Sequence, residues 1–489
     1  MINLKELVEV LEVEDTVGNL DIDITGIAYD SRKIRPGELF VAITGFEVDG
    51  HDFINGAIAN GAQAVLVEKD IANKDVTTIK VSNTRKALAR ASAKFYDYPA
   101  DDLTIIGVTG TNGKTTTTYL IESVLDNLGL KTGLIGTIKN KVGTSIQGAS
   151  RTTPESLDIQ RFFAQMREEG VTHAVMEVSS HALELGRVLE IDFDRQVFTN
   201  LSQDHLDFHQ SLEDYLNAKL KLFTMNDKPA IINFDDQQAD KIKEQARGEI
   251  ISYGLEDEVD FKARDIKIDV KGVNYQLITK QNKLPVKLKL SGKFNVYNSL
   301  AAIATVASLG FDLTEIKEGI EDICGVPGRF QLIDQGQDFG VIVDYAHTPD
   351  GMENVLKTAN EFTTGRVIVV FGCGGDRDRK KRPIMGRLGV TLADFAIVTS
   401  DNPRSEDPMD IIADIMPGIN ELEKKSGEDY IVIENRGEAI NKAVEMANAD
   451  DIILIIGKGH ETYQDLGDKV IDFDDSEVAR EALEYRSEE

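Results

Sequence analysis

Short apolar runs alternate with helical patterns along most of the chain. The runs LTIIGV, AVMEV and DIILIIG begin at Leu103, Ala174 and Asp451, and patterns typical of helices lie between runs of this kind. Apolar strands that alternate with helices form parallel sheets covered by helices on both faces. Hydrophobic residues make up 41% of the chain, enough for packed cores. The pattern therefore predicts an α/β protein.

Three regions separate along this pattern, and 489 residues are more than one hydrophobic core serves. The first region ends near Asp101 in YDYPADDL, where Pro99 and paired aspartates indicate a linker. The second opens with LTIIGVTG and contains a β-rich insert at 261–292, followed by a helical run at 295–310. The third alternates strands and helices again after VPGRFQLI. The predicted domains are 1–101, 102–331 and 332–489.

Charge and composition exclude several classes of protein. The net charge of -30 argues against nucleic-acid binding through the overall field. The N-terminus lacks a signal-peptide pattern, and no apolar run reaches the ~18 residues of a membrane span. Cys324 and Cys373 form no CxxC pair and are expected to be buried apolar residues. We expect a cytoplasmic monomer with no nucleic-acid or membrane partner.

The segment GVTGTNGKTT, at 107–116, joins an apolar strand to an amphipathic helix. Glycines in such a turn let backbone N–H groups surround phosphate oxygens. Lys114 can reach the β- and γ-phosphates of a nucleotide, and the Thr115 hydroxyl can bind Mg²⁺. A strict P-loop has glycine where this chain has Val108, so general P-loop NTPases are not the nearest match.

The loop resembles the ATP loop of the Mur ligases and of the related folylpolyglutamate synthetases, which are ATP-dependent amide-forming enzymes. The resemblance covers nearly the whole chain. It implies an α/β fold of three domains: a UDP-binding domain, a central P-loop ATPase-like domain with a parallel sheet, and a Rossmann-like domain for the amino acid. It implies ATP as co-substrate and Mg²⁺ as cofactor. The implied ATP contacts are Gly110, Thr111, Asn112, Gly113, Lys114, Thr115, Thr116, Asn298, Arg329, Asp344 and His347.

Candidate metal ligands follow the loop. Glu177 ends the run AVME, where a carboxylate can bind a metal that bridges phosphates or can simply be solvated. His205 in TNLSQDHLDFH matches the family's metal-contacting histidine. The helix DYLNAKLKLF contains Lys219 and Lys221, between which sequence alone does not choose; the resemblance selects Lys219, as a carbamylated lysine. The implied metal ligands are Thr115, Glu177, His205 and Lys219, and Lys114 and Arg329 complete the catalytic set.

The stretch YDSRKIRPGELFVAITGFEVDGHDFI, at 29–54, resembles the UDP-binding domain of the tripeptide-forming members of the family. Hydroxyl groups and arginine suit a substrate with pyrophosphate and carboxylate groups. The family often has glutamine where this chain has Leu185, and a His-Gln type pair where it has Phe46 and Glu47, so no contact is assigned there. The implied contacts to the UDP-linked muramoyl peptide are Ser31, Thr152, Thr153, Ser179 and Arg187.

The segment SDNPRSEDP resembles the form found in members that add meso-diaminopimelate, whereas lysine-adding members lack the arginine. Arg404 can bind the distal carboxylate of meso-diaminopimelate, and Asp401 and Asn402 can bind its ammonium group. Lysine would leave the arginine unpaired, at a cost of ~1–3 kcal/mol. With GGDRD and GKGHE, the implied contacts are Arg377, Asp401, Asn402, Pro403, Arg404, Gly457 and Glu461.

The resemblance implies one reaction sequence in peptidoglycan precursor synthesis. ATP phosphorylates the D-glutamate carboxylate of UDP-N-acetylmuramoyl-L-alanyl-D-glutamate, and the meso-diaminopimelate amine then attacks the acyl phosphate. Lys114, two Mg²⁺ ions and Arg329 would offset the negative charge. We expect the third domain to close over ATP, because the acyl phosphate must be shielded from water.

Three alternatives stay open. The chain could add L-lysine instead, against which Arg404 argues. A folylpolyglutamate synthetase would share the ATP loop but is not expected to carry the N-terminal domain or the DNPR segment. A nucleotide-binding regulatory or scaffold protein would have no need to keep Glu177, His205 and Lys219 together.

Overall fold

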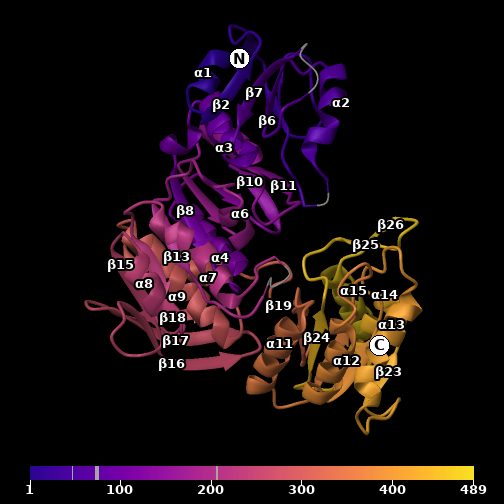
Figure 1. Cartoon of the computed structure of the whole chain (residues 1–489). Helices are drawn as coiled ribbons and strands as arrows, with labels where there is room; N and C mark the ends of the chain where they lie inside the picture. Colours follow the sequence, from indigo (N-terminus) through magenta and orange to yellow (C-terminus); the bar gives the residue numbers. More distant parts are fainter. Residues whose placement is uncertain (47, 72–75, 205–207, 489) are drawn as a thin grey trace. The chain divides into compact units, whose positions relative to one another are not determined.

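The computed structural model describes residues 1–46, 48–71, 76–204 and 208–488 (Figure 1). Parallel sheets with helices on both faces confirm the predicted α/β class. Within the described ranges, no helix is both long and apolar enough to cross a membrane. The chain forms two compact units, Met1–Phe261 with Leu300–Gly319 and Lys262–Ser299 with Ile320–Glu489. The boundaries between the three predicted domains remain predictions.

The first unit begins with a five-stranded sheet of order β2-β7-β6-β5-β4, in which only β2 is antiparallel to its neighbour. Asn83 caps the longest helix of this part by accepting a hydrogen bond from the Lys86 backbone at 2.9 Å. The strands are β2 (Val13–Val17), β4 (Ile27–Ala28), β5 (Leu39–Val41), β6 (Ala64–Val67) and β7 (Thr77–Val81), beside the short pair β1 (Ile2–Asn3) and β3 (Asp23–Ile24). The helices are α1 (Leu4–Val8), η1 (Gly50–Phe53), α2 (Ile54–Ala59), α3 (Thr84–Phe95) and η2 (Pro99–Asp102).

A second sheet of the first unit has the order β11-β10-β9-β12-β8-β13-β14-β15, and all of it from β9 to β15 is parallel. The strands are β8 (Thr104–Thr109), β9 (Thr132–Ile135), β10 (Lys139–Val142), β11 (Ser145–Gly148), β12 (His173–Glu177), β13 (Arg195–Phe198), β14 (Ala230–Asn233) and β15 (Ile250–Gly254). The helices are α4 (Lys114–Asn127), α5 (Ser156–Glu168), α6 (Ser180–Glu184), α7 (Leu212–Thr224) and α8 (Ala239–Gln245). The chain reverses its direction of strand addition at β8, and ligands of α/β sheets bind at such a point.

The β-rich insert predicted at 261–292 is confirmed as an antiparallel meander. Its strands are β16 (Phe261–Asp269), β17 (Gly272–Ile278) and β18 (Lys283–Leu288). The helical run predicted at 295–310 is confirmed as α9 (Lys293–Ser308), and α10 (Leu313–Asp322) follows it.

The second unit contains a six-stranded sheet of order β19-β20-β24-β21-β22-β23, in which only β19 is antiparallel. The strands are β19 (Gln331–Leu332), β20 (Gly340–Asp344), β21 (Val367–Phe371), β22 (Phe395–Val398), β23 (Tyr430–Val432) and β24 (Ile452–Ile456), and a hairpin of β25 (Tyr463–Asp465) and β26 (Val470–Asp472) follows. The helices are α11 (Pro349–Phe362), α12 (Lys381–Leu392), α13 (Pro408–Asn420), α14 (Arg436–Met446) and α15 (Asp475–Glu488).

Alternate residues of the strands enter separate cores on the two faces of this sheet. Val369 and Leu454 pack in the core with residues of α11, α12 and α13. Val370 and Ile455 pack in the opposite core with residues of α14 and α15. This arrangement explains why the strands read as continuous apolar runs: both faces are covered.

Candidate active site

The glycine-rich loop connects β8 to α4, as the sequence predicted. Gly110 and Gly113 have φ angles of 148° and 85°, in the region that favours glycine. A Cβ atom on Gly110 would lie 1.9 Å from Thr199 Oγ1. The Thr111 backbone N–H donates to the Asn200 carbonyl at 2.8 Å, and the Asn112 N–H donates to Asn200 Oδ1 at 3.0 Å. The residues that follow β13 therefore hold the loop in shape.

Two lysines point into this loop from different helices. Lys114 Nζ donates to the Gly110 and Thr111 carbonyls at 2.9 and 2.8 Å. Lys219, which is 1% exposed on α7, donates to the same Gly110 carbonyl at 2.8 Å and lies over the Tyr215 ring. Burial, reinforced by the positive charge of Lys114, holds the pKa of Lys219 well below its ordinary value. The second lysine of the helix, Lys221, is exposed and pairs with a glutamate instead.

Glu177 is fully buried at the end of β12. Thr115 Oγ1 donates to Glu177 Oε2 at 3.0 Å, so two of the predicted metal ligands are in direct contact. Thr137 donates its backbone N–H to Oε1 at 2.7 Å and its hydroxyl to Oε2 at 3.0 Å. A hydroxyl and a carboxylate are oxygen ligands of the kind that Mg²⁺ prefers. His205 lies outside the described residues, so its place in this group stays a prediction.

Four of the five predicted contacts to the acceptor lie close to Glu177. Thr153 Oγ1 donates to the Glu177 carbonyl at 2.8 Å and accepts from the Ser179 N–H at 3.1 Å. Arg187 donates to the Thr153 carbonyl at 2.9 Å, and Thr152 contacts the Thr137 hydroxyl that binds Glu177. Ser31 follows β4 in the other sheet, where its carbonyl accepts from Asn60 Nδ2 at 3.0 Å.

Glu155, which the sequence analysis missed, gathers three arginines near this group. Its side chain is buried and pairs with Arg187 at 3.0 Å, Arg85 at 3.2 Å and Arg151 at 3.2 Å. Arg85 belongs to the N-terminal sheet's helix α3, far from the others in sequence. No local pattern marks such a cluster, although Arg151 directly precedes the predicted Thr152.

In the second unit, DNPR follows β22 and lies against the GKGHE segment that follows β24. Asn402 is 1% exposed, and its Nδ2 donates to Glu461 Oε2 at 2.8 Å. Gly457 has a φ of 117°, and a Cβ atom there would lie 2.7 Å from Asp401 Oδ2. Lys458, a buried residue that the sequence analysis missed, donates to Asn402 Oδ1 at 3.2 Å and to Glu461 Oε2 at 3.1 Å. Its position within GKGHE was the available signal.

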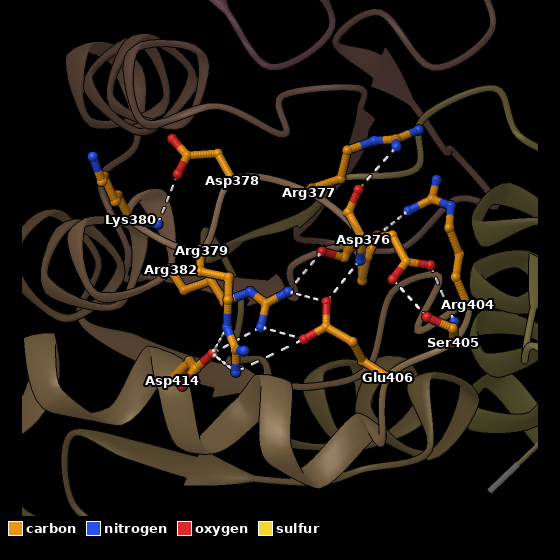
Figure 2. Close-up of polar contacts among 12 residues, drawn as sticks. Asp376, Arg377, Asp378, Arg379, Lys380, Arg382, Arg404, Ser405, Glu406 and Asp414 are labelled. Carbon is orange, nitrogen blue, oxygen red and sulfur yellow. Dashed lines mark hydrogen bonds and ion pairs between the residues drawn. The ribbon is translucent and has the colours of Figure 1, made fainter. Parts of the chain in front are cut away.

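Arg377 and Arg404 come from two loops that touch each other (Figure 2). Arg404 donates to the Gly375 carbonyl at 2.7 Å, while Arg377 donates to the Asp376 carbonyl at 3.1 Å. A Cβ atom on Gly375 would lie 1.8 Å from the Pro403 carbonyl oxygen, so this glycine allows the close approach. The structure thus brings together the predicted diaminopimelate contacts from three loops of one unit.

The remaining predicted ATP contacts belong to the second unit. Asp344 accepts from the Phe330 and Ala346 backbone N–H groups at 2.7 and 2.8 Å. Burial raises the pKa of Asp344, an effect that the positive charge of Arg329 opposes. The Arg329 guanidinium lies 4.8 Å from the centre of the Tyr345 ring.

Two other residues of this set have contacts with their own surroundings. The Nδ1 atom of His347 contacts the Tyr345 carbonyl at 3.0 Å. Asn298 lies in the second turn of α9, where its Nδ2 donates to Asn295 Oδ1 at 3.0 Å.

Comparisons with known proteins agree with this geometry. Three family models match: "Mur ligase family, catalytic domain" at 23–96, "Mur ligase middle domain" at 108–306 and "Mur ligase, glutamate ligase domain" at 328–459. A UDP-N-acetylmuramoyl-L-alanyl-D-glutamate--2,6-diaminopimelate ligase from Clostridium tetani (strain Massachusetts / E88) is 48% identical, over 98% of this chain and 99% of its own length.

Solved structures show the same likeness. One of a ligase with the same name is 35% identical, with a TM-score of 0.72 and coverage of 99% of both chains. Folylpolyglutamate synthase from Mycobacterium tuberculosis shares the fold alone, at 18% identity and a TM-score of 0.58, and covers 76% of this chain. Because its similarity to relatives extends through both units and almost from end to end, the chain belongs to the Mur ligase family.

Proposed function

We propose that the protein is an ATP-dependent ligase that adds meso-2,6-diaminopimelate to UDP-N-acetylmuramoyl-L-alanyl-D-glutamate in cytoplasmic peptidoglycan precursor synthesis. The observation that carries the proposal is the length of the match: a relative named for this reaction is 48% identical over 98% of the chain. The chain also carries both the phosphate loop and the DNPR segment. Neither a folylpolyglutamate synthetase nor a nucleotide-binding scaffold needs this combination.

The first unit supplies the groups that would hold ATP. Lys114 is placed to release its two loop carbonyls and bind phosphate oxygens instead. Thr115 and Glu177 would hold Mg²⁺, which offsets phosphate charge when it is bound. Lys219 would act as a carbamylated ligand: burial lowers the pKa of its amine, which favours the neutral form, and a neutral amine is the form that reacts with CO2. The Glu177 carboxylate contacts Thr115 just after the loop, and the Lys219 amine contacts Gly110 at its start.

In this proposal, the group of residues around Thr153 and Arg187 binds the acceptor, UDP-N-acetylmuramoyl-L-alanyl-D-glutamate. The hydroxyls and guanidinium of that group suit a substrate whose D-glutamate carboxylate must reach the γ-phosphate of ATP. After phosphorylation, the diaminopimelate amine forms the amide bond and inorganic phosphate leaves. Arg329 would stabilise the transferring phosphoryl group from the second unit.

Selection of the amino acid falls to the loops of the second unit. Arg404 and Arg377 present two guanidinium groups to a ligand whose far end carries a carboxylate, and Asp401 and Glu461 can bind ammonium. The sequence suggested that Asn402 binds the ammonium group of the ligand, but its oxygen has protein donors, so we propose that it orders the loop. Its Oδ1 accepts from Lys458 and from the Asp465 N–H at 2.9 Å, and these contacts hold the side chain in place.

The test is phosphate release from ATP with Mg²⁺ and UDP-N-acetylmuramoyl-L-alanyl-D-glutamate, with meso-diaminopimelate and L-lysine compared in parallel. We expect release with meso-diaminopimelate alone, and Arg404→Lys should raise its KM by ~10-fold or more because a bidentate contact is lost. Release with lysine alone would favour the second candidate, a lysine-adding ligase. Release with neither amino acid would contradict the ligase proposal.

A further inference from the structure

Hydrogen bonds join the loop that carries Arg377 to the loop that carries Arg404 (Figure 2). The Gly375 N–H donates to the Asn402 carbonyl at 2.9 Å. Ser405 donates its hydroxyl to Asp376 Oδ1 at 2.6 Å and its N–H to Asp376 Oδ2 at 3.2 Å. The distance between the two guanidiniums therefore depends on contacts outside the residues predicted to bind substrate.

The Glu406 carboxylate and the buried Arg382 add further hydrogen bonds to this contact between the loops. Glu406 Oε1 accepts from the Asp376 N–H at 2.7 Å and from Arg382 NH2 at 2.7 Å, while Oε2 accepts from Arg382 NH1 at 2.9 Å. Arg382 is fully buried in the first turn of α12. The hydrogen bond from Arg382 lowers the pKa of Glu406 to about 2, and the bond from the Asp376 backbone N–H makes a smaller contribution. The carboxylate is therefore ionised at neutral pH.

Both loops are held in backbone conformations that residues with a Cβ atom rarely adopt. Asp376 has a φ of 54° and Arg404 a φ of 53°. Such conformations persist only where the surroundings impose them, and they cluster at ligand sites. The contacts from Glu406 and Ser405 end on Asp376, so they act at one of the two strained positions, next to Arg377.

We propose that Glu406, oriented by Arg382, is a positioning residue that sets the separation of the Arg377 and Arg404 guanidiniums and so favours an amino acid with two carboxylates. This inference rests on the proposed ligase function. It goes further in assigning selectivity to a carboxylate that does not touch the substrate.

A purely structural role is the competing explanation, and Asp414 provides the matched control. Asp414 lies on α13, and its Oδ2 accepts from Arg382 NH1 at 2.8 Å and from Arg379 NH2 at 2.8 Å. Asp414 thus shares the same buried arginine and also binds the Arg379 side chain, but it lacks the hydrogen bond to the Asp376 backbone N–H that directly precedes Arg377. If the network only joins α12 to α13, the two carboxylates should matter equally.

The experiment compares the full-length variants Glu406→Gln and Asp414→Asn in KM for meso-diaminopimelate, KM for ATP, kcat and Tm. We expect Glu406→Gln to raise the KM for meso-diaminopimelate by ~10–100-fold while the KM for ATP stays within a factor of about two. Asp414→Asn should leave both KM values near wild type. Ser405→Ala, which removes one contact to Asp376, should give a smaller rise in the same KM if Glu406→Gln does not fold.

Two results would overturn the inference: an unchanged KM for meso-diaminopimelate in Glu406→Gln and Ser405→Ala, or equal rises in Glu406→Gln and Asp414→Asn that follow their loss of Tm. Wild-type enzyme that releases no phosphate with meso-diaminopimelate would instead overturn the proposed function, so the two failures are distinguishable.

Discussion

At the scale of single residues, burial decides what each lysine of α7 can do. Lys219 and Lys221 are two positions apart on one helix, yet one is 1% exposed and the other pairs with Glu184 at the surface. The buried Lys219 amine loses its hydration, and this loss drives its pKa down. A buried lysine beside a second lysine is costly to keep, which argues for a functional reason to keep it.

Replacing Lys219 with methionine should separate stability from activity. The unfolded chain holds the Lys219 proton up to about pH 10.5, whereas the folded chain releases it at much lower pH. Between those values the unfolded state binds more protons, so wild-type stability rises with pH. In CO2-free buffer at pH 7, we expect Lys219→Met to raise Tm by roughly 2–4 °C, the shift that ~1 kcal/mol produces.

The gain in Tm should shrink as pH approaches 10.5, while phosphate release is nearly abolished at every pH. Lys114 still donates to the Gly110 carbonyl, so this acceptor keeps a partner in the variant. Lys221→Met is the matched control and should change neither property. Lys219→Ala should regain part of its activity with added short carboxylic acids. Full activity in either Lys219 variant would exclude the role of metal ligand.

At the scale of elements, the phosphate loop is a joint product of β8, α4 and the segment after β13. Backbone and side-chain groups of Asn200 bind Thr111 and Asn112, and Thr199 donates to the Asn112 carbonyl at 2.6 Å. Because these contacts hold the loop from the neighbouring segment, we expect little ordering of the loop to accompany ATP binding.

A methyl group on Gly110 should damage this arrangement specifically. Its Cβ would lie 1.9 Å from Thr199 Oγ1, and its φ of 148° disfavours alanine. We expect Gly110→Ala to weaken ATP binding by at least ~10-fold, measured by titration calorimetry. Gly129→Ala is the control: φ is 77°, but no atom lies within 4 Å of the added carbon. Its Tm should fall while ATP affinity persists; equal affinity loss in both variants would contradict a local effect.

At the scale of the whole molecule, the predicted ATP contacts are divided between the two compact units. Lys114, Thr115 and Glu177 belong to the first unit, and Arg329 and Asp344 to the second. The amino-acid site around DNPR is also in the second unit, whereas the proposed acceptor group around Thr153 is in the first. In the proposed reaction, amide formation would require groups from both units to act on one acyl phosphate.

Ligands should accordingly change how the two units are arranged. We expect the radius of gyration from small-angle X-ray scattering to fall when a non-hydrolysable ATP analogue, Mg²⁺ and the acceptor are added together. Shielding the acyl phosphate from water is the physical reason for closure. Glu177→Gln, which removes a carboxylate from the proposed metal site, should reduce the change. An identical scattering profile with and without ligands would count against closure.

Much of the fold and of the site could be predicted from local sequence. Apolar runs between helical patterns predicted parallel sheets, and the insert at 261–292 was correctly predicted as β-rich. GVTGTNGKTT predicted a loop between strand and helix, and DNPR does follow a strand. These signals are local because strand–turn–helix units and glycine-dependent turns are set by neighbours in sequence. The roles of His205 and of the other site residues remain predictions.

Only the tertiary structure decided which residues share a site. It buries Lys219 and leaves Lys221 exposed, places Arg85 beside Glu155, and joins Asp376 to Glu406, because burial and pairing depend on segments far apart in the chain. The expectation for Cys324 was wrong: it is exposed, whereas Cys373 is buried. By itself, the sequence determined the alternation of elements and the chemistry available at their ends. Packing then determined which of those groups lost water and found partners, and those two effects govern pKa and specificity.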